Sequence, residues 1–397
     1  MWFRIHSFIG LGLSLVFAFV FLTGTLAVFS SEIDWLLTPE SRVAPSSVSG
    51  ETNWAAVARS AADYEPDLAF DLIEAPVSPI FAAEVYMTRP DGGLRVLYVH
   101  PETGAVQGEG AMLSAKALLR QAHRNWLLPD RIGIPLVTLT SLFLLGSLIS
   151  AMIVYKRWWR GFLAWPRRGR GSRAFWGDLH RFVGAWSLAF GFVFALTGAW
   201  YLVEQLAAPA PAFETPFVDD VKLTNREVAR ALPEALALAR RDYPELSVRQ
   251  IGWPGPAGSA LGFYGQDGTL LVRPRANAIF VDIFGNKVAG RHSGSDASAH
   301  QRISEAADPV HMGNFAGYWS KTLWFLAGAL LTLVAMSGAV IYAKRAAAGG
   351  RAASADAPRG RWGWLSLRKG IGLSLFMLAM LLIAAGLQLP GLIALMR

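Results

Sequence analysis

Long apolar runs without a charged side chain alternate with polar segments along this chain. Each run is long enough for the roughly 20 residues that cross the hydrocarbon core of a bilayer. The pattern therefore predicts a mainly α-helical membrane protein that is embedded in a lipid bilayer. The five runs span residues 5–31, 132–155, 182–203, 322–343 and 370–396.

Charge gives the expected orientation of these spans. The chain has 53% hydrophobic and 17% charged residues and a formal net charge of +8. Its basic residues concentrate in the connection between spans two and three and in the connection between spans four and five. By the positive-inside rule both connections, and the N-terminus, are expected in the cytoplasm, and the C-terminus on the other side. Because the excess charge lies in these short connections, we expect no nucleic-acid partner.

The two long segments after spans one and three are then expected to be extracytoplasmic. The chain has no cysteine, so neither segment is expected to depend on disulfides. The first apolar run is longer than the core of a signal peptide, which favours an uncleaved anchor. The expected order is transmembrane helix 1–31, outer domain 32–130, helix 131–156, cytoplasmic loop 157–177, helix 178–206, outer domain 207–317, helix 318–343, cytoplasmic loop 344–369 and helix 370–397.

An internal repeat relates the two halves of the chain. A shift of 174 residues aligns His6 with His180 and aligns Leu22-Thr23-Gly24 with Leu196-Thr197-Gly198. Self-similarity at a fixed offset is the signature of a duplicated unit. We therefore expect a four-helix transmembrane core built from a tandem helix–domain–helix repeat, with the fifth helix outside it.

The repeat continues into the two outer segments. Each carries a stretch of helical pattern, and the second opens with the capping-box pattern Thr224-x-x-Glu227. Each then carries hairpin signals, Asp91-Gly92-Gly93 and Asp267-Gly268, and a strand–turn–strand pattern. Gly104 and Asn286 occupy the same position in that last turn, and both residue types tolerate a left-handed backbone. Two small α+β domains are expected.

Four of the seven histidines occupy repeat-equivalent positions at the ends of predicted spans. His6 and His180 begin helices that run outward, whereas His123 and His311 precede helices that run inward. This arrangement gives one histidine pair for each face of the membrane. Imidazole is the usual axial ligand of b-type haem, and two helices of a bundle can hold one iron between them. The pattern therefore predicts two haem b groups, with His6 and His180 ligating one iron and His123 and His311 the other.

Haem groups near opposite ends of helices about 30 Å long would have edges on the order of 10 Å apart, so the predicted chemistry is electron transfer across the bilayer. A structural role for the histidines, with polar tips at the headgroups, is the alternative. Zinc would need further ligands. The remaining histidines, His100, His292 and His300, are interpreted as surface residues. Glycines near the expected ligands are open to two roles, making room for a macrocycle or packing helix on helix; these are Gly10, Gly12, Gly184 and Gly191.

These motifs resemble the PepSY-associated transmembrane family over nearly the whole chain. The resemblance is carried by the His-x-Phe-Ile-Gly helix that ends in Leu-Thr-Gly, by Tyr-Val-x-Pro-x-Thr-Gly, by Asp178-Leu-His-Arg181 and by His311-Met-Gly-Asn-Phe-Ala-Gly317. It implies an inner-membrane protein of Gram-negative bacteria with periplasmic PepSY-like domains. The family's membrane histidines then map onto His6, His123, His180 and His311.

The resemblance also implies an activity, an oxidoreductase that reduces a periplasmic ferric siderophore or another ferric chelate. The sequence has no Gly-rich dinucleotide fingerprint and no space for a flavin domain in its cytoplasmic connections. The expected electron donor is therefore a cytoplasmic flavoprotein or a quinol. No acid–base or nucleophilic catalytic residue is indicated. The alternatives are a non-enzymatic PepSY protein that binds a periplasmic partner, and a haem-handling transporter or sensor.

Overall fold

The protein consists of two compact units. The computed structural model describes residues 1–44, 51–66, 68–89, 93–111, 114–218, 223–254 and 260–353, together with residues 379 and 386. The first unit, called the helical unit here, contains the described residues of Met1–Ser30 and Leu118–Pro209 and those from Val310 onward. The second, called the sheet unit, contains the described residues of Ser31–Ala117 and Ala210–Pro309.

Apolar helices long enough to cross a bilayer make up most of the helical unit. Within the described residues three helices pass this criterion alone: α6 (Asp130–Val154), α7 (Ser172–Leu206) and the Gly317–Lys344 part of α10 (Gly317–Ala353). A fourth span is formed if the bent pair α1 (Trp2–Gly12) and α2 (Ser14–Val28) is taken together. The chain is therefore a membrane protein with several apolar helices. The fifth predicted span, 370–397, lies outside the described residues except at 379 and 386.

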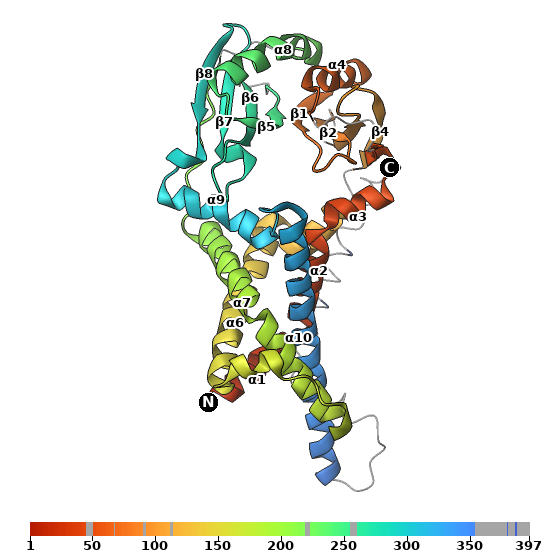
Figure 1. The fold of residues 1–397 in the computed structure, drawn as a ribbon, viewed down its shortest axis with the longest axis vertical. Coiled ribbons are helices and arrows are strands. Elements are labelled where there is room, and N and C mark those ends of the chain that lie inside the picture. Colours follow the sequence, from red (N-terminus) through yellow and green to blue (C-terminus); the bar gives the residue numbers. More distant parts are fainter. Residues whose placement is uncertain are drawn as a thin grey trace. The chain divides into compact units, whose positions relative to one another are not determined.

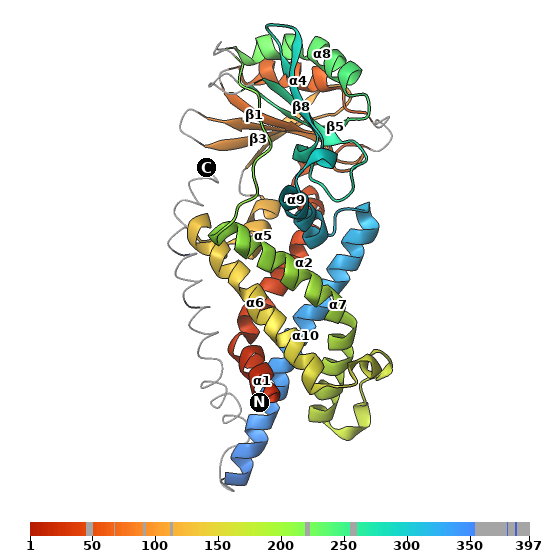
Figure 2. The same ribbon diagram turned by 90° about the vertical axis from the view of Figure 1, so that its left-hand side faces the viewer.

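The first span is bent, which the apolar pattern alone did not predict. α1 and α2 meet at 63°, and Leu13 between them leaves the helical conformation at φ −111° and ψ 11°. Gly10 and Gly12 precede the bend, and glycine costs about 1 kcal/mol relative to alanine inside a helix. After the bend the chain changes neighbours, because α1 packs mainly on α6 whereas α2 packs on α10 (Figure 2).

Two helix ends also differ from the predicted boundaries. α7 begins at Ser172 rather than 178, so part of the predicted loop 157–177 is helical. The rest of that connection contains the short 3-10 helices η3 (Trp158–Leu163) and η4 (Arg168–Arg170). α10 continues beyond the predicted end at 343 to Ala353. Charged residues near a membrane boundary stop the apolar run, but they are compatible with a helix, which explains both differences.

The sheet unit contains one eight-stranded antiparallel sheet with the order β4-β3-β2-β1-β5-β6-β7-β8. The first outer segment supplies β1 to β4, drawn in orange and brown, and the second supplies β5 to β8, drawn in green and cyan (Figure 1 and Figure 2). The strands are β1 (Ala69–Glu74), β2 (Ala83–Thr88), β3 (Leu94–Val99), β4 (Val106–Ala111), β5 (Ser247–Gly252), β6 (Leu261–Gln266), β7 (Ala278–Asp282) and β8 (Lys287–His292).

The two predicted outer domains are thus not separate, because β1 and β5 join them. Ile73 pairs with Ile251 in this antiparallel ladder, and the Gln250 side chain donates a 2.6 Å hydrogen bond to Glu74. An unpaired strand edge exposes a row of backbone donors and acceptors, and pairing the two edges satisfies both rows. The duplication therefore yields a single sheet whose central strands come from different copies.

Two helices cover one face of this sheet, as the helical patterns predicted. α4 (Trp54–Tyr64) and α8 (Asn225–Asp242) lie side by side on it (Figure 2). One hydrophobic cluster runs beneath both helices and includes the fully buried Val57, Leu232 and Ile251. The predicted capping box at the start of α8 is present, with Thr224 and Glu227 bonded reciprocally.

The repeated turns confirm the expected backbone and assign a role to His100. Gly104 has φ +72° and Asn286 has φ +46°. In the second turn the Asp282 carboxylate accepts hydrogen bonds from the backbone of Phe284 and Gly285. In the first turn His100 Nδ1 accepts from the backbone of Glu102 and Thr103. His100 is therefore a turn-capping residue, equivalent to Asp282. Asp91 and Gly92 of the first predicted hairpin lie outside the described residues, and Asp267-Gly268 begins a connection of 11 residues between β6 and β7.

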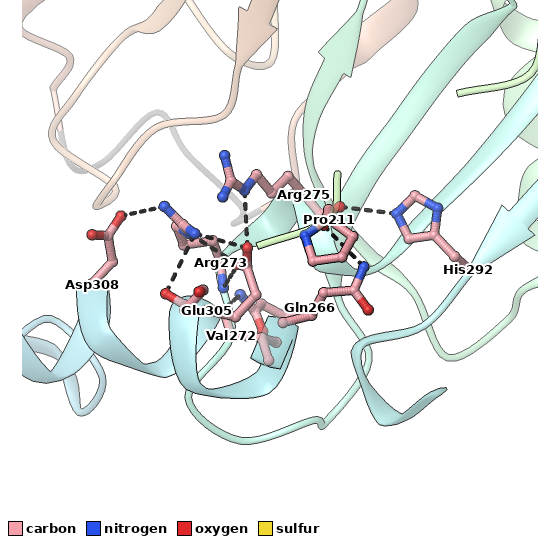
Figure 3. A network of polar contacts seen from close by, with 10 residues as sticks. Pro211, Gln266, Val272, Arg273, Arg275, His292, Glu305 and Asp308 are labelled. Atoms are coloured by element: carbon pink, nitrogen blue, oxygen red, sulfur yellow. Dashed lines mark hydrogen bonds and ion pairs between the residues drawn. The ribbon is translucent and has the colours of Figure 1, made fainter. Parts of the chain in front are cut away.

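A buried ion-pair network connects α9 (Ala299–Met312) to the loop before β7. Glu305 is only 2% exposed and accepts hydrogen bonds from Arg273, at 2.8 and 2.9 Å, and from Arg275, at 3.0 Å. Arg273 also donates to Asp308 at 2.7 Å (Figure 3). A buried carboxylate needs partners of this kind to offset its desolvation. The network therefore holds Glu305 and Asp308 in the sheet unit; Asp308 is structural.

Candidate functional site

The four repeat-equivalent histidines lie in the helical unit as two close pairs. The ring centroids of His6 and His180 are 6.4 Å apart, and those of His123 and His311 are 6.0 Å apart. His6 is in α1 and His180 in α7, whereas His123 is in α5 (Ala115–Arg124) and His311 in α9. The structure thus brings together the two histidines of each predicted pair.

The first pair is held by two matching contacts to neighbouring helices. His6 Nδ1 lies 3.1 Å from the Ser147 carbonyl and 3.2 Å from the Ser150 hydroxyl, both on α6. His180 Nδ1 lies 3.1 Å from the Val334 carbonyl and 2.9 Å from the Ser337 hydroxyl, both on α10. Each serine hydroxyl donates its own proton to the same carbonyl, so it can only accept from the imidazole.

Sequence reasoning missed these two serines, although a signal was present. Ser150 lies five residues before Tyr155, and Ser337 lies five residues before Tyr342, in the repeated Tyr exit of each span. Serine is common in membrane helices, where it usually bonds a carbonyl one turn earlier. The repeat of the Ser-x4-Tyr spacing is what distinguishes this pair.

The second pair is held by contacts to α2 and α7, the first helices of the two repeated units. His123 Nδ1 donates to the Val20 carbonyl of α2 at 2.9 Å, and His311 Nδ1 lies 2.7 Å from the Thr197 hydroxyl of α7. Thr197 donates to the Val193 carbonyl, so it accepts the hydrogen bond from His311. His311 also packs edge-on against the rings of Phe194 and Tyr201.

The Leu-Thr-Gly motif of α2 makes room for His123. A Cβ on Gly24 would be 2.7 Å from Cε1 and 2.9 Å from Nδ1 of His123. The equivalent Gly198 instead meets Ser141 of α6, with 2.9 Å to its Cβ. The repeated glycine therefore admits an imidazole in one copy and a neighbouring helix in the other.

These contacts fix the tautomer of the rings. A carbonyl oxygen only accepts, so Nδ1 of His6, His123 and His180 carries the proton and Nε2 carries the lone pair. Within the described part of the chain no hydrogen bond reaches Nε2 of these three residues. A Nδ1–H bonded to a carbonyl, with Nε2 directed elsewhere, is the usual arrangement of a metal-ligating histidine.

The spacing within each pair matches two axial ligands on one metal. Two imidazole nitrogens trans to each other at about 2.0 Å from the metal, each about 1.1 Å from its ring centroid, put the centroids about 6.2 Å apart. The two observed separations, 6.4 and 6.0 Å, fall on either side of this value. No cluster of three or more histidine, aspartate or glutamate residues suited to a metal ion occurs among the residues that the structure describes. The donor sets are therefore pairs, which suits a metal whose other ligands come from a macrocycle.

A cavity of about 630 Å³ adjoins the His6–His180 pair, within the usual size range of cofactor sites. Gly10 and Gly184 line it, and a Cβ on either would meet nothing within 4 Å. Gly12 also faces open space, whereas a Cβ on Gly191 would be 3.0 Å from Leu148. The two roles left open for these glycines are therefore divided: Gly191 packs helices, and Gly10 and Gly184 widen the cavity.

The remaining histidines and the nearby aspartates have other surroundings. His292 was interpreted as a surface residue, but it is half-buried in β8, where it stacks on Phe213 and bonds the Arg275 carbonyl (Figure 3). His300 lies in α9. Asp130, the first residue of α6, pairs with Arg124. None of these residues joins the histidine pairs.

A family model described as PepSY-associated TM region matches residues 3–345, most of the chain. No curated protein matches the sequence.

Proposed function

This chain belongs to the PepSY-associated transmembrane family, and from that premise we propose that it is a b-type cytochrome that passes electrons across a membrane to a ferric chelate. Two haem b groups would be held, one between His6 and His180 and one between His123 and His311. The observation that carries the proposal is the spacing of both pairs, 6.4 and 6.0 Å between ring centroids, with Nδ1 of each ring held by the protein.

The chain's own residues would set the properties of each site. Carbonyls of Ser147, Val334 and Val20 hold the Nδ1 protons, which orients Nε2 and raises its basicity as a ligand. Bound haem supplies one-electron chemistry at its iron. With both imidazoles of a pair holding the group, each site would suit electron transfer rather than oxygen chemistry.

α7 links the two sites. His180 and Thr197, the partner of His311, are 17 residues apart on this helix, which corresponds to a rise of about 25 Å. The two pairs thus lie near opposite ends of one apolar span. An electron entering at His6–His180 would leave at His123–His311 after crossing most of the hydrocarbon core.

The direction and the partners follow from the charge pattern and the family resemblance. The Lys/Arg-rich connections favour a cytoplasmic location for the His6–His180 end and a periplasmic location for the His123–His311 end of an inner-membrane protein. The donor would be a cytoplasmic flavoprotein or quinol, and the acceptor a ferric siderophore in the periplasm. Reduction of a ferric chelate needs no acid–base residue in this chain.

A visible spectrum with a haem count tests the proposal. The full chain, purified in detergent, is expected to show low-spin reduced bands and about two haems per chain by pyridine haemochrome assay. Protein reduced with dithionite, freed of excess reductant and mixed with a ferric siderophore should then be reoxidised. A chain without haem would overturn the cytochrome and favour a PepSY protein that binds a periplasmic partner. Ready transfer of the haem to apomyoglobin would favour a haem-handling transporter or sensor. A stable di-haem protein that is oxidised only by other acceptors would exclude a ferric siderophore as the electron acceptor.

A further inference from the structure

Charged residues gather at one end of the cavity beside His6 and His180. Most of the lining is apolar and comes from α1, α2, α6, α7 and α10, with Leu11, Phe17, Leu144 and Leu331 among its members. The charged lining residues are Arg167, Arg173, Asp178 and Arg181, from the connection before α7 and its first turns. The cavity is therefore amphipathic, with an apolar body and a basic end.

One carboxylate organises this basic end. Asp178 is 5% exposed and accepts from Arg167 Nε at 2.7 Å and Nη2 at 3.0 Å. It also forms an ion pair with Arg181, one turn farther along α7. Asp178 thus fixes two guanidinium groups that are each about half exposed, 52% and 49% at the side chain. Each guanidinium group still has N–H groups that do not contact Asp178.

Arg173 stands apart from this cluster. Within the described residues it makes no ion pair, and its side chain is exposed although it lines the cavity. Three arginines and one aspartate leave two positive charges at this end of the lining. An uncompensated pair of charges beside an apolar cavity indicates a ligand that is apolar along most of its length and carries about two negative charges at one edge.

We propose that Arg173, with Arg167 and Arg181, binds the two carboxylates of a macrocyclic cofactor ligated by His6 and His180. Guanidinium groups pair with carboxylates through charge-assisted, often bidentate hydrogen bonds. The cofactor would then be oriented with its carboxylate edge toward the α6–α7 connection and its apolar edges among the helices. Asp178 is a positioning residue, since it acts through Arg167 and Arg181.

This assignment rests on the haem function proposed above, and the experiment keeps the two apart. Chain expressed under haem limitation would be titrated with haemin and with haemin dimethyl ester, which has the same macrocycle without the two negative charges. His123→Ala/His311→Ala variants leave the first site to be read alone. Arg173→Gln is compared with Arg160→Gln, an exposed arginine in η3 that does not line the cavity.

We expect Arg173→Gln to weaken haemin binding by about tenfold, while Arg160→Gln binds as the parent does. The dimethyl ester should bind parent and Arg173→Gln equally, because the carboxylate contact is already lost. Loss of a positive charge should also lower the midpoint potential of the first site. If the double-histidine background does not fold, the same potential shift is read in the full di-haem chain by redox titration.

Equal haemin affinity and an unchanged potential in Arg173→Gln would overturn the carboxylate assignment but not the cytochrome. A chain that binds neither haemin nor its ester would remove the proposed function itself. If Arg173→Gln instead reduces only the amount of anionic phospholipid that copurifies, the basic end binds a lipid phosphate and the assignment is wrong.

Discussion

The imidazole of His123 fills the space beside Gly24 that a side chain at position 24 would need: a Cβ there would be 2.7 Å from Cε1 of the ring. Side-chain carbons do not approach this closely, so either the ring or helix α2 must move if residue 24 gains a methyl group. Since His123 is also held by the Val20 carbonyl, one turn earlier on α2, the ring has little freedom to retreat.

Gly24→Ala is therefore expected to disturb the His123–His311 pair and leave the other pair intact. The haem count should fall from about two to about one per chain, with only one spectral component lost. Gly12→Ala is the matched control, because a Cβ there meets nothing within 4 Å. Two fully occupied haems in Gly24→Ala would contradict the expectation that the contact between Gly24 and His123 limits haem binding.

Single histidine substitutions test the pairing directly. His6→Ala and His180→Ala should each remove the same spectral component, because one iron needs both rings, and His123→Ala and His311→Ala should each remove the other. His100→Asp serves as a control, because an aspartate can keep the turn-capping role of His100, as Asp282 does in the second copy. Pyridine haemochrome assays and redox titration provide the readout. Different components lost from His6→Ala and His180→Ala would contradict the pairing.

The serines beside the first pair should tune its potential. Ser150→Ala and Ser337→Ala each remove one of two acceptors for a ligand Nδ1–H, while the carbonyl contact remains. A weaker hydrogen bond at Nδ1 makes the imidazole a poorer donor and destabilises the ferric state. Both variants should therefore raise the midpoint potential of the first site and leave the second unchanged. Ser141→Ala, next to Gly198, is a buried-serine control.

The β1–β5 junction should hold both halves of the sheet together. Ile251 is fully buried at this ladder, opposite Ile73, and Ile251→Ala should cost about 2–5 kcal/mol. Hydrogen exchange of the full chain in detergent should then show faster exchange in β1 and β2 as well as in β5 and β6. The exposed Arg249→Ala on the same strand should change little. Faster exchange confined to β5–β8 would mean that the copies are stable independently.

The stability of the sheet unit should depend on pH through Asp267 and Tyr243. Burial alone would raise the pKa of Asp267, but hydrogen bonds from Tyr243, Ser293 and Thr269 outweigh it and hold the pKa well below the usual range. The folded chain thus binds fewer protons here than the unfolded chain. The stabilisation is complete above pH about 4 and is lost as the pH falls toward the lowered pKa.

Burial, and next the bond to Asp267, raises the pKa of Tyr243 to about 12, so its contribution is present below pH about 10 and lost between about 10 and 12. Asp267→Asn should lower stability by about 1 kcal/mol at pH 7. The difference from the parent should shrink on acidification to pH 3. Asp63→Asn, in an exposed ion pair with Arg226, is the control, and thermal unfolding of the full chain is the measurement. A difference that stays constant from pH 7 to pH 3 would contradict the lowered pKa.

Repeat spacing explains which parts of the structure were predictable. The offset between His6 and His180 and the matched exits of the spans identified the histidine pairs, since equivalent positions on duplicated helices lie at equivalent depths. Local chemistry identified the left-handed turns at Gly104 and Asn286 and the capping box at Thr224, because these depend on neighbours within a few residues.

Other features depend on contacts that periodicity does not contain. The bend at Leu13 accompanies a change of neighbour, from α6 for α1 to α10 for α2. A run of apolar residues has the same pattern whether the helix it forms is straight or bent. The pairing of Ile73 with Ile251 joins residues far apart in the chain, and a strand pattern does not reveal which edge meets which. The roles of Ser150 and Ser337 depend on how α6 and α10 are rotated about their axes.

The joined sheet also sets an order of events during synthesis. β1 ends at Glu74 and its partner β5 begins at Ser247, so 172 residues separate them, including spans α6 and α7. At about 5–20 residues per second the ribosome needs on the order of 10 to 30 s to deliver the partner strand. Throughout that interval the nascent β1 presents an open edge on its own. A chaperone that binds extended segments would therefore be expected to bind β1 of the nascent chain. Truncation between the two copies would leave this strand edge unpaired permanently.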